Sequence, residues 1–161
     1  MACDLMQDLS LSACKDGVGG VRRFYVANWD KVDWDNSTIV TGEYTALDML
    51  NIGDQFFTYE LVKQTSSFTE NVTSSVENGT VFFEPTFELV LNTMDLNKRN
   101  ELLLLARANV AIIFETNEET PTYWIMGSRN GCDVTAGSTT SGTAFGDRNG
   151  YTLTFGGLEP E

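Results

Sequence analysis

The chain has 161 residues, the length of one domain, and its 42% hydrophobic content argues against a mostly disordered protein. Its 23 acidic and 10 basic residues leave a formal charge of −13, which argues against tight nucleic-acid binding because such binding needs a basic surface. The chain has no histidine, which removes the commonest general base, the Ser–His and Cys–His pairs and the usual catalytic zinc sites.

The N-terminal segment predicts a flexible arm over residues 1–20. It is polar and ends in KDGVGG, whose glycines form a hinge and lack the order of a phosphate-binding loop. The acids in MACDLMQDLS do not fit a signal peptide, and no apolar run is long enough to cross a bilayer, so we expect synthesis in a cytoplasm and no membrane partner. Cys3, Cys14 and Cys132 are then expected to be reduced thiols, with a three-thiolate metal site as the alternative.

The next segment predicts one strand followed by a polar turn. RRFYVANW (22–29) is rich in aromatic and β-branched residues, as strands are. Asp33, Asp35 and Ser37 have the spacing of calcium ligands, but the glycine and glutamate of an EF-hand loop are missing, which favours an exposed turn. Residues 30–54 leave two alternatives open, an inserted loop or core strands.

The middle of the chain predicts a long β-hairpin over residues 55–93. Apolar and polar side chains alternate along residues 55–73 and again along 80–93, and 74–79 supply turn residues. Pro85 cannot donate to a strand ladder, so it predicts a bulge or a switch of register. Strands much longer than the usual 5–6 residues are expected to project from their domain.

One helix and several short strands complete the prediction. Asp95 is the expected N-cap of a helix near residues 96–107, in which Leu102 to Leu105 suggest that most of the circumference is covered. Short strands are expected at 109–116 and 122–128. Together the elements predict an α+β fold, mainly antiparallel sheet, with one helix covering an open face.

The C-terminal region repeats itself. SRNGCDVTAG (128–137) and DRNGYTLTFG (147–156) share Arg-Asn-Gly, and Asn-Gly is the strongest short hairpin signal. We therefore expect two successive hairpin turns of a β-meander. The alternative is a paired ligand site built from Arg129 and Arg148.

No catalytic, cofactor or metal site is predicted. Glu84 and Glu88 are a candidate carboxylate pair, but four residues along one strand separate them by roughly 13 Å, too far for a glycosidase. An arm, an oversized polar hairpin and an acidic charge are instead typical of proteins that assemble by strand addition.

Several stretches resemble one class of virion protein: MACDL and CKDGVGGVRRFYV, SSFTENVTSSVENGTVFFEP, LNKRNELLLLA, and NGCDVTAGSTTSGTAFGDRNGYTLTFGGLEPE. They are similar to small virion proteins of tailed bacteriophages, in particular the tail tube (major tail) type. The resemblance covers most of the chain, with residues 30–54 matched least. It implies two packed sheets, sandwich-like or barrel-like, with one flanking helix and a long projecting hairpin in a single domain.

The same resemblance implies a function without catalysis. The protein would form hexameric rings that stack into a tube, and DNA would pass through during ejection without binding tightly. Its partners would be other copies of itself and other virion proteins, and it would enter the virion after synthesis in the host bacterial cytoplasm. The alternatives are a capsid decoration or neck protein, a carbohydrate-binding β-sandwich, and an enzyme, for which the chain offers no nucleophile–base pair.

Two sets of residues are predicted to serve this function. Residues 64–80 carry few apolar side chains to offset an ordering entropy of roughly 1–2 kcal/mol per residue, so neighbouring copies are expected to order them. The candidate assembly residues are Ser66, Phe68, Glu70, Val72, Val76 and Asn78. The polar positions of the hairpin give the candidate lumen-facing carboxylates, with the outer surface as the alternative: Glu60, Glu70, Glu84 and Glu88.

Overall fold

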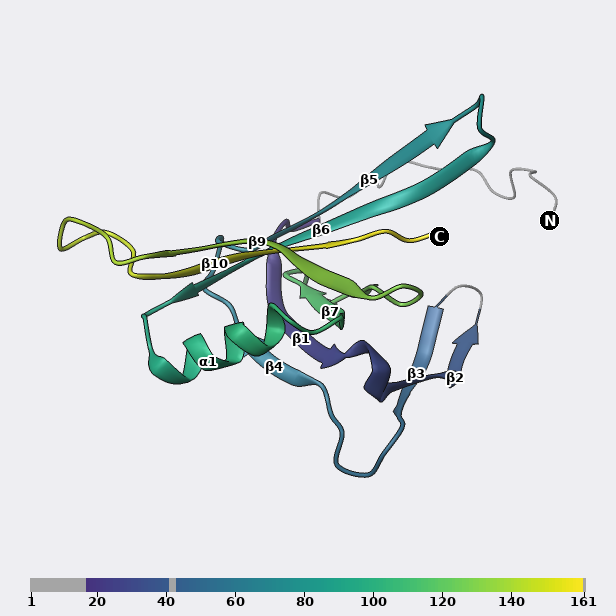
Figure 1. Ribbon diagram of the computed structural model, residues 1–161, viewed down its shortest axis with the longest axis horizontal. Coiled ribbons are helices and arrows are strands. Elements are labelled where there is room, and N and C mark those ends of the chain that lie inside the picture. Colours follow the sequence, from purple (N-terminus) through teal and green to yellow (C-terminus); the bar gives the residue numbers. More distant parts are fainter. Residues whose placement is uncertain (1–16, 41–42, 161) are drawn as a thin grey trace.

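The computed structural model describes residues 17–40 and 43–160, and most of its strands form one antiparallel sheet (Figure 1). The strands of this sheet are β1 (Val21–Asn28), β4 (Phe57–Glu60), β5 (Ser67–Ser75), β6 (Thr80–Asn92), β7 (Val110–Thr116), β8 (Tyr123–Met126), β9 (Cys132–Thr140) and β10 (Gly150–Gly157). Their order is β4-β1-β7-β9-β10-β6-β5, and β8 also pairs with β7. The described residues hold a single α-helix, so the predicted α+β class with mainly antiparallel sheet is confirmed.

The large sheet consists of two halves that face each other. Strands β7 and β9 share one residue pair, Val110 with Cys132, so the sheet divides there into a β1 half-sheet (β4, β1, β7, β8) and a β6 half-sheet (β9, β10, β6, β5). Phe24 of β1 stacks on Phe87 of β6 with ring centroids 4.9 Å apart, and Phe155 of β10 lies 5.6 Å from Phe24. The two predicted layers are therefore halves of one sheet around an aromatic core.

The helix α1 (Leu96–Leu105) lies where the sequence predicts it. The Asp95 side chain accepts a hydrogen bond from a backbone N–H of the first turn at 3.2 Å, as an N-cap does. Leu102 and Leu105 are buried against the sheet, whereas Leu103 and Leu104 are exposed. The chain's own sheet therefore covers one side of the helix. Covering most of the circumference, as the sequence predicts, would require another chain.

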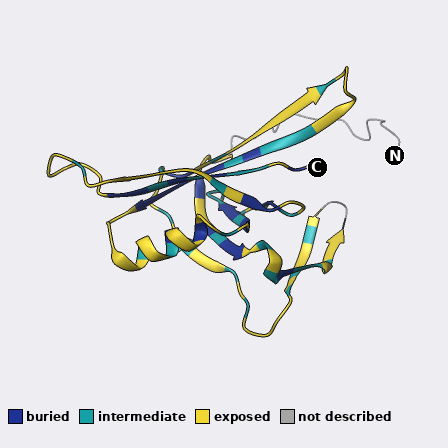
Figure 2. Cartoon of the chain, in the orientation of Figure 1, coloured by how far each residue is buried: buried dark blue, intermediate teal, exposed yellow. Residues whose placement is uncertain are grey.

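The predicted strand over residues 55–73 is broken in the structure. Its first part is β4, which pairs with β1, and its second part is β5, which pairs with β6 in the other half-sheet. Gln64, between the two strands, adopts a positive φ of 62°, and the chain turns in this segment. The long hairpin is therefore Ser67–Asn92, and its tip projects beyond the rest of the chain (Figures 1 and 2).

Pro85 does not cause the predicted bulge. The pairing of β5 with β6 continues through it without a shift, with Glu70 opposite Pro85. On the other side of β6, the last pair with β10 is Thr86 with Gly156. Pro85 thus lies between the last β6–β10 pair and a further antiparallel pair, Phe83 with Glu159, and its missing N–H interrupts the ladder between them without shifting the register.

The first Arg-Asn-Gly repeat is not a hairpin turn, and the second lies at the end of a longer hairpin loop that joins β9 to β10. β8 and β9, which flank the first repeat, both pair with β7, and the second repeat ends the loop (141–149) between β9 and β10. Each repeat instead anchors another segment. The Glu159 carboxylate accepts hydrogen bonds from the N–H groups of Arg129 and Asn130 at 3.1 and 3.3 Å. The Asn149 carbonyl accepts one from the N–H of Thr93 at 2.6 Å.

Residues 30–54 form strands. After a short 3₁₀-helix, η1 (Trp29–Lys31), strands β2 (Val32–Val40) and β3 (Glu43–Met49) make a separate two-stranded sheet. This hairpin packs on the β1 half-sheet through a small cluster centred on Ala27, Val32 and Ala111. Within β2, Asn36 donates to the Asp33 carboxylate from its side chain (2.7 Å) and its backbone (3.1 Å), which lowers the pKa of Asp33. Asp33 thus stabilises an irregular part of β2, between its pairs Asp33–Asp48 and Thr38–Ala46, where the sequence predicts an exposed turn. Of the predicted arm, only residues 17–20 are among the described residues.

Candidate assembly interface

The outer face of the β6 half-sheet is polar. Directly opposite residues of antiparallel strands share a face, so the register defines this surface. Phe87 and Leu89 point into the core, and the alternate positions point outward. We call this surface the polar face; its residues include Ser67, Thr69, Asn71 and Thr73 of β5, Glu84, Thr86 and Glu88 of β6, Thr152 and Thr154 of β10, and Asp133, Ala136, Ser138 and Thr140 of β9. Two apolar residues of β6 share the register of this face, Phe82, which is half-buried, and Val90, which is buried.

Only two of the four predicted lumen-facing carboxylates lie on the polar face. Glu84 and Glu88 do, whereas Glu70 is opposite Pro85 and therefore belongs to the other face of the hairpin. Glu60 is on β4, in the other half-sheet, opposite Arg23. The prediction that the four share one face is wrong, because the turn at residue 64 interrupts the alternation on which it depended.

The predicted assembly residues divide into two groups. Ser66 is buried, and its hydroxyl accepts a hydrogen bond from the N–H of Val90 at 3.2 Å. Phe68 is half-buried, with its ring centroid 4.5 Å from that of Phe114. These two side chains complete the chain's own core. The remaining four are exposed on the projecting hairpin: Glu70, Val72, Val76 and Asn78.

Strand β5 has an open edge, since no strand of residues 17–40 and 43–160 pairs with its outer side. The N–H of Val90 points toward the β5 side of β6, so the alternate residues Glu88, Thr86 and Glu84 also direct their backbone groups to β5. The β5 residues opposite them direct their own backbone groups to β6. The alternate β5 residues therefore direct their N–H and C=O groups away from the sheet. These outward residues are Phe68, Glu70, Val72 and Ser74.

Strand β9 has a second open edge, on the opposite side of the same half-sheet. It pairs with β7 at Cys132 alone, so residues 133–140 have no strand beside them on that side among the described residues. Both β5 and β9 have 9 residues, and each contains one acid and neither lysine nor proline. Natural edge strands are usually protected by lysine, proline, bulges or short length. β5 has none of these and β9 has a single bulge at Thr135, so the two long edges indicate pairing with another chain.

The β9 edge was missed in the sequence analysis, although a signal for it exists. SFTENVTSS of β5 and CDVTAGSTT of β9 are equally long and equally rich in Ser and Thr. Such strands form a ladder without a strongly apolar face. The similarity of the two sequences predicts that both strands serve as open edges for pairing with another chain.

We expect hydrogen exchange to detect the β5 edge. In the dissociated protein, the N–H groups of Glu70, Val72 and Ser74 have no strand partner in the described part of the chain and should exchange quickly. Assembly should slow their exchange about tenfold or more, because a neighbouring strand would then bond them. The N–H groups of β10 lie between β6 and β9 and serve as the control, protected in both states. Equal protection of the three β5 groups before and after assembly would contradict the interface.

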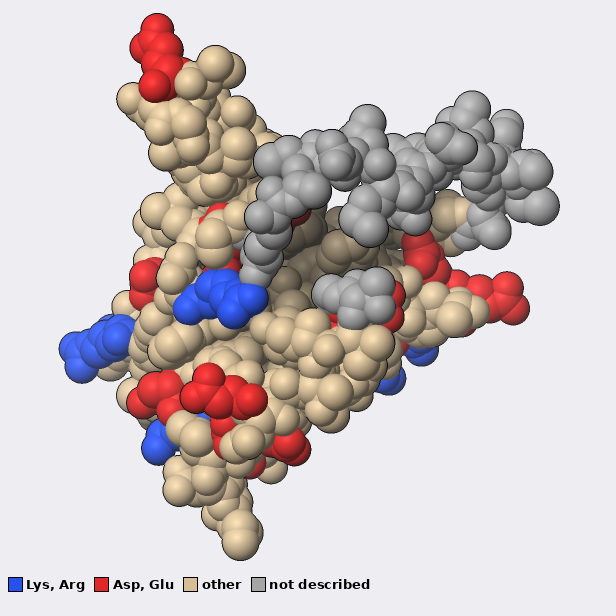
Figure 3. Space-filling view, turned by 90° about the vertical axis from the view of Figure 1, so that its right-hand side faces the viewer, with Lys and Arg blue, Asp and Glu red and all other residues tan. Residues whose placement is uncertain are grey.

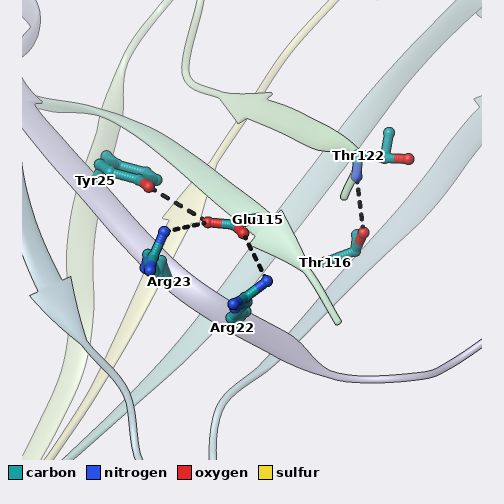
Figure 4. Close-up of polar contacts among 6 residues, drawn as sticks. All are labelled: Arg22, Arg23, Tyr25, Glu115, Thr116 and Thr122. Carbon is teal, nitrogen blue, oxygen red and sulfur yellow. Dashed lines mark hydrogen bonds and ion pairs between the residues drawn. The ribbon is translucent and has the colours of Figure 1, made fainter. Parts of the chain in front are cut away.

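The β1 half-sheet holds a buried carboxylate, Glu115 of β7, which is 2% exposed (Figure 4). Arg22 lies 3.5 Å from one of its oxygens, and Arg23 and the Tyr25 hydroxyl lie 3.4 and 3.3 Å from the other. The register of β1 against β7 shifts between Val21 and Arg23, which lets both arginines reach the same side. The cluster fastens the start of β1 to the sheet.

Removing this carboxylate should destabilise the fold. We expect Glu115→Ala to lower the free energy of unfolding by about 2–3 kcal/mol, because it removes the charge partner of two arginines and leaves a cavity. Glu115→Gln should cost less, since the amide oxygen still accepts a hydrogen bond. Urea denaturation measures both, with the exposed Glu119→Ala as the control, expected within about 0.5 kcal/mol of wild type. A Glu115→Ala protein as stable as the control would contradict this role.

Charge is otherwise dispersed. Figure 3 shows acidic and basic side chains in small groups separated by uncharged surface, without a continuous basic patch on that face. At the rim of the polar face, Arg148 of the β9–β10 loop donates to the Thr152 hydroxyl at 2.8 Å.

In residues 17–40 and 43–160, no group of three or more His, Cys, Asp or Glu side chains could hold a metal ion. No helix within the described part of the chain is long and apolar enough to span a membrane.

No family model, curated protein or solved structure matches the chain. Its function is therefore inferred from two features of the chain itself, the polar face and the two open edges.

Proposed function

We propose that the protein is a structural subunit that self-assembles into rings stacked as a phage tail tube, a conduit for DNA. The observation that carries the proposal is the pair of open edges, β5 and β9, on either side of one polar-faced half-sheet. Pairing β5 of each copy with β9 of the next continues the four strands around a ring. Closing the ring removes every open edge of this kind, as closed barrels do.

The packing of the half-sheets favours one orientation in such a ring. The inner face of the β6 half-sheet is covered by the β1 half-sheet through Phe24 and Phe87. The bulk of the chain, including α1 and the β2–β3 hairpin, therefore lies on that side. A closed ring has more room outside than inside, so the polar face would line the lumen.

A lumen of this composition suits the passage of DNA. Its side chains are mostly hydroxyls and amides, with Glu84, Glu88 and Asp133 as its acids. Carboxylates repel phosphates, and the four strands contribute no lysine or arginine that would bind them. The hexameric ring is taken from the resemblance to tail tube proteins.

Negative-stain microscopy of the purified protein tests this function. Hollow stacked rings are the expected result. Attachment to capsid shells without rings would favour the decoration or neck protein instead. Single copies that bind glycan arrays would favour the carbohydrate-binding module.

A further inference from the structure

The loop between β9 and β10 (141–149) carries a fully exposed aromatic side chain. Among the large apolar side chains of residues 17–40 and 43–160, Phe145 is the most exposed, at 114%. The loop extends past the sheet at the α1 end of the chain (Figure 1). A single exposed apolar side chain is common on protein surfaces, so its meaning depends on how it is held and what lies opposite it.

Hydrogen bonds within the loop hold Phe145 in a defined position. The Asp147 carboxylate accepts from the N–H groups of Thr143 and Ala144 at 2.8 and 2.7 Å, and the N–H of Asp147 donates to the Ala144 carbonyl at 3.1 Å. Gly142 opens the loop with a φ of 70°, which residues with a Cβ rarely adopt. Because the loop is ordered by its own contacts, Phe145 would lose little freedom on binding a partner.

The α1 end of the chain also has an apolar cleft. It lies between β4, the end of β6 and α1, and its volume of about 740 Å³ is within the roughly 300–1,000 Å³ typical of binding pockets. Phe57 and Val62 line it and are exposed by 52% and 39%, so its mouth is apolar. Leu91 and Leu102 are buried and line its inner end.

The cleft opens on the β5 side of the β6 half-sheet, whereas the loop belongs to the β9 side. Val62 precedes β5, and the β6 residues of the cleft lie beyond Glu88, the last residue that pairs with β5. A separate groove on the other side of α1 is lined by residues of β9 and β10. The loop and the cleft of one chain are therefore on opposite sides of the half-sheet, at the same end.

The β5–β9 pairing of the proposed ring would bring the loop of one copy to the cleft of the next. Neighbouring strands in the order β9-β10-β6-β5 are all antiparallel, so β5 and β9 run in opposite directions and would pair antiparallel between copies. Pairing the two strands along their full length places Ser67 opposite Thr140. Both residues lie on the polar face, so this register keeps the polar faces of the two copies continuous.

Beyond that pair, the next copy continues as its β9–β10 loop. It passes the segment that contains Val62 and the part of β6 that has no β5 partner, which is where the cleft opens. Phe145 follows Thr140 by five residues, at the tip of the loop. The strand pairing alone thus directs the exposed aromatic side chain of one copy toward the apolar mouth of the other.

We propose that Phe145 of each copy inserts into the α1 cleft of the next copy in the same ring. The contact rests on the proposed function for the ring, and it fixes the register in which β5 and β9 pair. It also gives the interface an apolar anchor. The paired strands are rich in Ser and Thr and would otherwise associate mainly through backbone hydrogen bonds, whereas a buried aromatic side chain is the usual centre of a stable interface.

Cysteine cross-linking tests the contact with Phe145 in place. Gly146→Cys and Val62→Cys are introduced together into full-length protein that also carries Cys3→Ser and Cys14→Ser, while the buried Cys132 is retained. A Cβ added at Gly146 meets nothing within 4 Å, so this change does not disturb the loop. After assembly and oxidation, we expect disulfide-linked oligomers that grow to the number of copies in one ring and stop there, because the links close a circle.

Two comparisons show whether the cross-link is specific. Dissociated protein should give no linked oligomers, since the two cysteines lie on opposite sides of one chain. Glu119→Cys, on the exposed β7–β8 turn, replaces Val62→Cys as the control and should also leave the chains unlinked after assembly. Linked chains longer than one ring would indicate a contact between rings and would contradict the proposal.

Side-chain truncation gives a second measurement. Phe145→Ala should raise the concentration needed for ring formation about tenfold, as for the loss of a central anchor, and leave urea denaturation of the dissociated chain unchanged. Val62→Ala should raise it about threefold, and adding it to Phe145→Ala should have no further effect, because their contact is already lost. Phe145→Leu should restore most of the assembly. Val76→Ala, at the hairpin tip, is the control and should act independently of Phe145→Ala.

The results separate this contact from the ring itself. Rings that form at the wild-type concentration with Phe145→Ala, and without the cross-link, overturn the contact and leave the ring intact. A wild-type protein that forms no rings under any salt condition overturns the proposed function and this contact with it. Circular cross-linking together with the non-additive effects of Phe145→Ala and Val62→Ala supports the contact.

Discussion

Replacing Val72 by proline should prevent ring formation while the chain still folds. The N–H of Val72 points out of β5, away from β6, so proline removes no hydrogen bond of the β5–β6 ladder. It does remove a donor that a neighbouring β9 would need, and its ring obstructs the approach of that strand. We expect the concentration needed for assembly to rise at least tenfold, measured by sedimentation and microscopy.

The matched control is Val72→Ala. Alanine also removes the valine side chain from the hairpin, but it keeps the N–H. If β5 pairs through its backbone, rings of Val72→Ala should form at close to the wild-type concentration. Equal ring formation by the proline and alanine proteins would remove β5 from the interface. Circular dichroism and urea denaturation confirm that both chains remain folded.

The sequence predicts the local elements of this fold better than their pairing. The strand at 22–29, the helix near 96–107 and its Asp95 cap follow from side-chain type and spacing, and the structure has all three. The break between β4 and β5 does not follow, because Lys63-Gln64-Thr65 contains neither glycine nor proline. The positive φ of Gln64 is imposed by the half-sheets that the two strands join, a tertiary effect that no local pattern reports.

The Asn-Gly repeats show the opposite error, a strong local signal overruled by long-range contacts. Asn149 ends the loop between the antiparallel strands β9 and β10, as the dipeptide suggests, but β8 and β9 both run antiparallel to β7, so the chain does not reverse at Asn130. The buried Glu159 then satisfies the N–H groups of the first repeat. A carboxylate thirty residues away in the sequence cannot be assigned to that turn without the structure.

The sequence predicts only part of the candidate interface, because the rest depends on contacts between strands that are far apart in the chain. Exposed positions on the hairpin, such as Val72 and Val76, follow from a polar sequence with too few apolar side chains. The inward placement of Phe68 depends on Phe114, a partner in the other half-sheet. Parity along one strand places Glu84 and Glu88 together, but relating either of them to Glu70 requires the register across the hairpin.

That register makes the charge of the lumen testable. Replacing Glu84 and Glu88 by lysine should slow DNA ejection from otherwise intact virions. In a ring, each position recurs once per copy, so the polar face would change from rings of negative charge to rings of positive charge that bind phosphates. Because such binding releases counterions, the delay should shrink steeply as salt is raised.

The control uses the two carboxylates that the register places elsewhere. Glu60→Lys with Glu70→Lys changes the net charge by the same amount, but Glu60 lies on β4 and Glu70 on the opposite face of the hairpin. Tubes of this protein should eject DNA at the wild-type rate. Wild-type assembly itself should improve with salt, because ions screen the repulsion between carboxylates over about 8–10 Å. Unchanged ejection by the Glu84→Lys, Glu88→Lys virions, with tubes of normal length, would place the polar face on the outside of the tube.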